Sequence, residues 1–122
     1  MNHETNRSGY RAEAFACRYL CRQGLKLLHR NFHGRRGEID LVMRDGDTLV
    51  FVEVRYRRRC THGRAVETVA RHKQLRIIAT AQYYMQRHRA WGMQARFDLF
   101  SLEGRIDKPD VDWIQDAFRP DA

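Results

Sequence analysis

Acidic side chains occur inside a segment that otherwise has the pattern of a protein core. In the stretch GEIDLVMRDGDTLVFVEVRYRRR, residues 37–59, Asp40, Glu53 and Arg55 stand among Val, Leu, Ile and Phe. Two carboxylates close together on an apolar sheet repel each other unless a cation or a proton compensates them. Mg²⁺ is typically held by one or two carboxylates together with waters and substrate phosphates. Such a site beside Arg55 would suit phosphodiester hydrolysis.

The turn between the two strands decides whether the two acids share a face. Side chains alternate along a strand, and residues directly opposite each other in an antiparallel pair point the same way. A loop over 45–48, or the tighter Gly46–Asp47 turn, places Asp40 opposite Glu53. An Asp45–Gly46 turn makes the two acids diagonal neighbours instead. Both put their Cβ atoms roughly 5 to 8 Å apart. The spacing fits ordinary acid–arginine pairs on an exposed sheet face equally well.

Hydrophobic periodicity embeds this hairpin in an α/β fold. Apolar residues at helical spacing predict a helix over about 6–23 and a second over about 67–89. Other predicted elements are strands over 25–32 and 95–102, a basic turn over 33–36, a loop over 57–67, and an edge strand or short helical turn over 111–118. This order predicts a mixed sheet with a helix on each face, in a single domain over residues 1–122.

Composition favours a soluble protein with a polyanionic partner. The net charge is +8, and 31% of the 122 residues are charged. Such an excess in a small domain is typical of nucleic-acid binding, although a basic surface without that role is also possible. The start of the chain is polar, so we expect no secretory signal and no membrane span. Three cysteines are too few for a disulfide scaffold, which favours reduced thiols and a cytoplasmic location.

The hairpin motifs resemble those of a known family. GEID at 37–40 and VFVEVR at 50–55, with the spacing between them, resemble the YraN-like family of small bacterial proteins. The segments AEAFACRYLCRQGLKLLHRNF, RHKQLRIIATAQYYM and RFDLFSL extend the resemblance over about residues 9–118. That family is similar to the PD-(D/E)XK nucleases and, among them, to archaeal Holliday junction resolvases. The resemblance implies a restriction-endonuclease-like mixed β-sheet flanked by helices, and a possible homodimer.

The resemblance also implies roles for individual residues. Asp40 and Glu53 match the two metal-binding acids, and Glu13 matches a helix acid that completes the site for Mg²⁺ or Mn²⁺. Lys73 matches a helix lysine facing the site. Arg55 occupies the position of the superfamily's lysine; because arginine stays protonated, it can contact phosphate but cannot act as a base. Glu13 and Lys73 also fit ordinary surface positions at the edge of an apolar stripe.

Basic residues flank the hairpin motif on both sides. If the hairpin forms, they gather at one end of the sheet and contact phosphates without reading sequence. These predicted nucleic-acid contacts are Arg35, Arg36, Arg57, Arg58, Arg59 and Arg64. Three functions follow: a metal-dependent endonuclease acting on structured or branched DNA, a non-catalytic nucleic-acid-binding module that retains the nuclease fold, and an assembly protein with an acidic partner.

Overall fold

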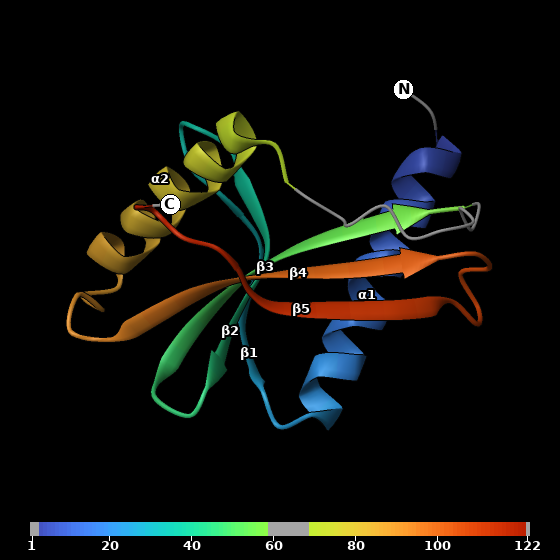
Figure 1. Cartoon of the computed structure of the whole chain (residues 1–122), viewed down its shortest axis with the longest axis horizontal. Helices are drawn as coiled ribbons and strands as arrows, with labels where there is room; N and C mark the ends of the chain where they lie inside the picture. The colour runs from blue at the N-terminus through green and yellow to red at the C-terminus, as the bar shows by residue number, and fades with distance from the viewer. Residues whose placement is uncertain (1–2, 59–68, 122) are drawn as a thin grey trace.

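The chain forms one five-stranded mixed sheet with two helices (Figure 1), as the sequence pattern predicts. The computed structural model describes residues 3–58 and 69–121. The strand order is β1-β2-β3-β4-β5; β3 and β4 run parallel, and the other neighbours are antiparallel. This α/β architecture is consistent with a restriction-endonuclease-like fold. The elements are α1 (His3–Arg22), β1 (Lys26–His33), β2 (Glu38–Asp45), β3 (Thr48–Arg57), α2 (Arg71–Arg87), β4 (Gln94–Glu103) and β5 (Asp110–Phe118).

Each face of the sheet packs against one helix. On the α1 side, Ala12, Ala16 and Leu20 recur at helical spacing and are fully covered by the sheet. On the α2 side, Ile77 and Tyr84 belong to a second buried cluster. In Figure 1 the two helices are separated by the twisted sheet. Strands buried on both faces read as nearly continuous apolar runs, which explains the Val- and Leu-rich hairpin.

The hairpin forms the first of the two turns that the sequence allows, the Gly46–Asp47 turn. β2 and β3 pair from Asp45↔Thr48 to Leu41↔Val52, so the turn is the two-residue Gly46–Asp47. Gly46 has φ +59°, a conformation that glycine adopts without strain. The last pair, Leu41↔Val52, stands directly before Asp40 and Glu53, and both acids line one pocket, which confirms that they share one face; the alternative Asp45–Gly46 turn is wrong.

The remaining predictions agree closely with the observed elements. Residues 110–118 form a full edge strand, which resolves the alternative left open by the sequence. α1 begins three residues earlier than the apolar periodicity indicated, because its first turn is polar. α2 begins at Arg71, with Ala70 at its N-cap, so the start expected at about residue 67 is too early. Residue 67 itself and most of the loop over 57–67 lie outside the described residues.

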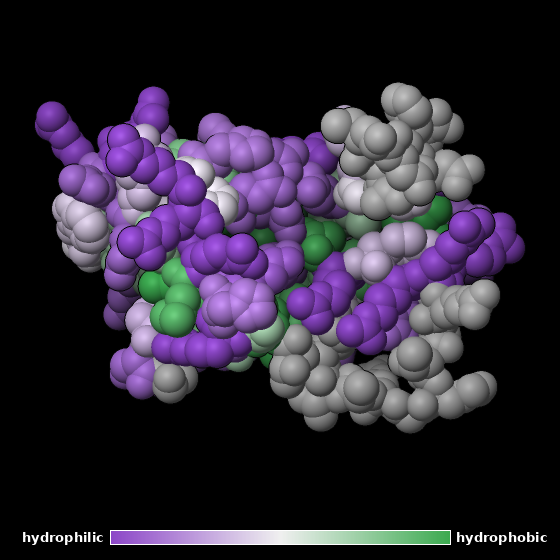
Figure 2. Space-filling view, turned by 90° about the horizontal axis from the view of Figure 1, so that it is seen from above, coloured by the Kyte–Doolittle hydropathy of each residue, from purple (hydrophilic) through white to green (hydrophobic). Residues whose placement is uncertain are grey.

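One face of the molecule is largely polar. Figure 2 shows a face dominated by hydrophilic residues, with hydrophobic ones visible in the gaps between them. This is in keeping with a chain in which 31% of residues are charged. Across residues 3–58 and 69–121, no helix is both long and apolar enough to cross a membrane.

Candidate functional site

Asp40 and Glu53 face a common pocket of about 160 Å³ on the α2 side of the sheet. Backbone pairing between β2 and β3 ends at Leu41↔Val52, just before the two acids. At this point a side chain takes over from the backbone hydrogen bonds between the strands: Asp40 Oδ2 accepts a hydrogen bond from Val54 N–H at 2.8 Å. The pocket is lined by Arg36, Gly37, Glu38, Asp40, Glu53, Lys73, Arg76 and Ile77.

The environment of Asp40 disfavours its ionised form. Burial and the neighbouring charge of Glu53 raise the pKa of Asp40 to about 8, with smaller contributions from Glu13 and Glu38. The hydrogen bond from Val54 N–H acts in the opposite direction and lowers this pKa. A carboxyl group held in this way is stabilised either by a proton or by a cation placed between it and Glu53. The pocket therefore favours positive charge at this point.

Lys73 supplies positive charge from α2. Its Nζ lies 3.1 Å from Glu53 Oε1, and the Glu53 side chain is only 10% exposed. A partly buried pair of this kind is screened by solvent less than a surface pair. The prediction that Lys73 faces the site agrees with this contact. The pair also means that a cation bound by Glu53 would share the carboxylate with Lys73.

The basic turn between β1 and β2 is packed tightly onto α2. Gly34 N–H donates to Gly37 C=O at 2.8 Å, which closes the turn. A Cβ at Gly34 would approach Thr80 Cγ2 to 3.2 Å, so little room exists there for a side chain. This close approach brings Arg36 to the rim of the pocket, while Arg35 is exposed beside it. The sequence prediction of basic residues next to the acids agrees with this placement.

Glu13 lies near the pocket but does not line it. It faces β1, where Arg30 Nη2 is 3.8 Å from its Oε1. Burial raises the pKa of Glu13, against the lowering effects of Asn31 and Arg30. In the described part of the chain no three His, Cys, Asp or Glu side chains group closely enough to hold a metal ion. The role of Glu13 as a third metal ligand therefore stays a prediction.

Three of the other predicted basic residues, Arg55, Arg57 and Arg58, do not line the pocket. Arg55 is half-buried on β3 and is not among the described residues that line it. Arg57 and Arg58 are exposed at the end of the same strand. Arg59 and Arg64 lie outside the described residues. Their contacts to nucleic acid stay predictions.

The two-carboxylate arrangement fits a small divalent cation. Mg²⁺ and Mn²⁺ take oxygen ligands, and Mg²⁺ commonly uses only one or two carboxylates and keeps several waters. Asp40 and Glu53 provide two such groups, and burial together with the charge of Glu53 raises the pKa of Asp40. Their pocket is large enough for the ion with its remaining waters.

Comparison with known proteins places this arrangement in a family. The profile of the "Uncharacterised protein family UPF0102" matches residues 12–102, three quarters of the chain. The chain belongs to the UPF0102 family. It is 44% identical to a UPF0102 protein of Nitrosococcus oceani over the full length of both chains. A UPF0102 protein of Stutzerimonas stutzeri is 47% identical, over 94% of this chain and 97% of that one.

The sequence motifs thus identified the UPF0102 family, the YraN-like group, correctly. The relative from Methylococcus capsulatus, 46% identical over 90% of this chain and 89% of its own, carries the same family name. These names assign no reaction. What this UPF0102 chain does must therefore be inferred from its own pocket.

Sequence reasoning did not single out Arg76, which lines the pocket beside Lys73. The signal was present, because residues three apart on a helix lie on the same face. Once Lys73 was assigned to the site, Arg76 was the next cation on that face. Thr80, one turn further along, donates its hydroxyl to Arg76 C=O at 2.8 Å and packs against Gly34.

Proposed function

We propose that this chain is a metal-dependent endonuclease of the PD-(D/E)XK type that acts on structured or branched DNA. The observation that carries the proposal is the shared pocket of Asp40 and Glu53 with Lys73 at its side. Acids that bind a divalent ion next to cations that bind phosphate are the requirement for cutting a phosphodiester. The +8 net charge supports a nucleic-acid substrate.

Asp40 and Glu53 would hold Mg²⁺ or Mn²⁺ in this pocket. When bound, such an ion polarises a phosphoryl oxygen and makes water a better nucleophile. The chain's contribution is to fix the two carboxylates. The hydrogen bond from Val54 N–H orients Asp40, and the ion pair with Lys73 orients Glu53. Preorganised groups of this kind act without rearranging during the reaction.

The cations of the pocket would receive the phosphate. Arg36 approaches from the β1–β2 turn, and Lys73 and Arg76 approach from α2. Their positive charge would stabilise the negative charge that develops on the phosphoryl oxygens. Lys73 supplies the ammonium group that Arg55 does not, since a guanidinium stays protonated and cannot take up a proton from water.

A cleavage assay tests the proposal. Purified protein is expected to nick branched or partly single-stranded DNA in Mn²⁺, and EDTA is expected to stop the reaction. Asp40→Ala should show no cutting, whereas Asp47→Ala, which changes an exposed acid in the hairpin turn, should cut like wild type. Absence of cleavage by wild type over four-way, flap and single-stranded substrates in both metals would refute the proposal.

One observation favours a second function, a non-catalytic nucleic-acid-binding module. The position of the superfamily's lysine holds Arg55, and Lys73 already compensates Glu53. A binding module would not need the metal. It would therefore bind DNA equally well in EDTA and after Asp40→Ala, with a strong dependence on salt. Binding of that kind without cutting would decide for this second function.

Removing the ammonium group of Lys73 is expected to separate catalysis from metal binding. Lys73→Met should lower the cleavage rate by roughly 100-fold, the size seen when one group that stabilises transition-state charge is lost. Mn²⁺ affinity, measured by calorimetry, should stay equal or rise, because Glu53 no longer shares its charge with Lys73. Lys108→Met is the matched control, since Lys108 is an exposed lysine in the β4–β5 turn. Cleavage at the wild-type rate by Lys73→Met would remove Lys73 from the reaction.

A further inference from the structure

A second cationic groove runs along α1, on the face of the sheet opposite the acid pair. It is a cavity of about 440 Å³ between α1 and the turn that follows β4. Figure 1 shows that turn beside α1, far from α2. Three arginines of α1 line the groove: Arg11, Arg18 and Arg22. Nothing in the mechanism proposed above uses them.

Among the described residues that line this groove, three arginines accompany one acid, Asp107, whose pKa is lowered by Arg105 and, to a smaller extent, by Arg11. Among the described residues, none of the three forms an ion pair, whereas Arg30, Arg96 and Arg119 each have a carboxylate partner. Asp107 is the acid that lines the groove, and Arg105 already binds it through two hydrogen bonds, at 3.1 and 2.8 Å. The groove therefore carries positive charge that an external anion can neutralise.

The spacing of the arginines suits a strand of phosphates. Positions i, i+7 and i+11 lie along one side of a helix, about 10 Å and about 6 Å apart at 1.5 Å per residue. A stacked nucleic-acid strand advances about 3.4 Å per nucleotide. The three side chains therefore match phosphates roughly three and two nucleotides apart. A single small anion would leave at least one of the three unused.

Aromatic rings accompany these charges. Tyr10 lines the groove with 63% of its surface exposed, and Arg30 lies over its ring at 5.1 Å from the centroid. Tyr19 forms a fixed wall, because its ring packs edge-on against Phe100 and Trp113. A cationic groove with an exposed aromatic ring is the usual means of binding single strands, in which bases stack on the ring.

We infer that the α1 groove binds a single strand of nucleic acid through the phosphates, with one base stacked on Tyr10. The inference rests on the proposed function in one respect: it names the substrate as DNA that presents a duplex to the acid pair and an unpaired arm to the opposite face. A flap or a displaced strand has this form. The groove and the pocket would then hold two parts of one branched molecule.

Strand binding by the groove is tested by fluorescence anisotropy in EDTA, where no cutting occurs. Replacing Arg11, Arg18 and Arg22 by Gln together should weaken binding of a labelled 15-nucleotide single strand at least tenfold. The slope of log affinity against log salt should fall by about 2, at roughly 0.7 per phosphate contact. Duplex binding should change no more than in a charge-matched control with Gln at Arg87, Arg89 and Arg119, which are all exposed. Equal loss of single-strand affinity in both triple variants would overturn the inference.

The role of Tyr10 has its own test. Tyr10→Ala should weaken binding of an ordinary single strand about tenfold and leave binding of an abasic strand unchanged, whereas Tyr10→Phe should bind both like wild type. Equal loss for ordinary and abasic strands would overturn the stacking role.

If the arginine triple variant loses binding to phosphatidylglycerol vesicles but not to the strand, the groove is a membrane contact and the inference fails. Strand binding by the groove in a protein that never cuts DNA would refute the endonuclease alone.

Discussion

Asp40→Asn is expected to abolish stabilisation by divalent metal and, at the same time, to make the metal-free protein more stable. The asparagine oxygen still accepts the hydrogen bond from Val54 N–H, but the charge that burial and Glu53 oppose is gone. Without that charge the variant loses a metal ligand and also loses a repulsion. A residue that only supported the fold would not show both effects.

The gain in stability from Asp40→Asn depends on pH with a definite sign. The pKa of Asp40 is about 8 in the folded chain and near its ordinary 3.8 in the unfolded chain. Between these values the folded state keeps a proton that the unfolded state has released. The stability due to this proton is therefore complete below about pH 4 and is lost as the pH rises to about 8. The free energy of unfolding of the asparagine variant does not fall in this way, because asparagine does not ionise.

Thermal melts at several pH values measure this difference. At pH 8 the melting temperature of Asp40→Asn should exceed that of wild type by about 5–10 °C, corresponding to roughly 1–2 kcal/mol, and the difference should shrink toward pH 5. Mn²⁺ should raise the melting temperature of wild type through mass action and leave the variant unchanged. Asp47→Asn is the control. Lower stability of Asp40→Asn at every pH, or equal stabilisation of it by Mn²⁺, would contradict the assignment.

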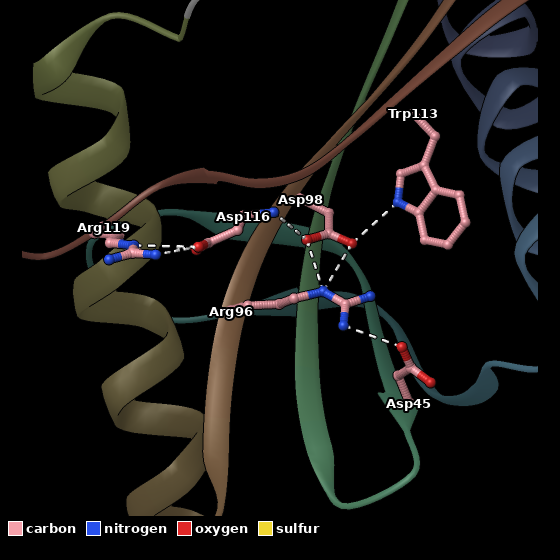
Figure 3. A network of polar contacts seen from close by, with 6 residues as sticks. All are labelled: Asp45, Arg96, Asp98, Trp113, Asp116 and Arg119. Atoms are coloured by element: carbon pink, nitrogen blue, oxygen red, sulfur yellow. Dashed lines mark hydrogen bonds and ion pairs between the residues drawn. The ribbon is translucent and has the colours of Figure 1, made fainter.

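Asp98→Ala is expected to cause a large loss of stability. Asp98 on β4 is fully buried and accepts four hydrogen bonds (Figure 3). Arg96 Nε lies 3.0 and 3.2 Å from its two oxygens, Trp113 Nε1 donates at 3.0 Å, and Asp116 N–H donates at 3.0 Å. Arg96 also contacts Asp45 at the end of β2, so the cluster links three strands.

Removing this carboxylate leaves Arg96 with only Asp45 as a carboxylate partner, and it leaves Trp113 Nε1–H and Asp116 N–H without their acceptor. Breaking a buried ion pair on one side typically costs about 3–5 kcal/mol. The melting temperature of Asp98→Ala should therefore fall by about 15 °C or more. The denaturant concentration at the midpoint of unfolding, measured by Trp fluorescence, should also be lower than for wild type. Asp98→Asn keeps an acceptor and should lose less than Asp98→Ala. Asp112→Ala, at a partly exposed acid of β5, should lose less than 1 kcal/mol. A loss that small for Asp98→Ala would show that the cluster does not stabilise the fold.

The hairpin and the helices were predictable from sequence because their signals are local. The two-residue turn and strand alternation together determine which face Asp40 and Glu53 share, and the observed register agrees. Apolar spacing likewise predicted the buried side of α2, including Ile77, Ile78 and Tyr84.

The contacts that sequence did not reveal depend on strands that meet only in the folded chain. Asp98 reads as one polar residue in an alternating strand, and its partners are Arg96 on β4 and Trp113 and Asp116 on β5. Arg76 joins the pocket only because α2 crosses above the hairpin at that point. Arg55, whose place in the motif suggested a role at the site, is not among the described residues that line the pocket, so that role stays a prediction.

The parallel pairing of β3 with β4 has a consequence for the order of folding. Thr48 pairs with Gln94, far along the chain, whereas the β2–β3 hairpin closes over two residues. Contacts this distant in sequence form more slowly than local ones, since a long loop must close first. During synthesis the hairpin with its acids emerges before α2. A nascent chain would therefore contain Asp40 and Glu53 before Lys73 is present to neutralise Glu53.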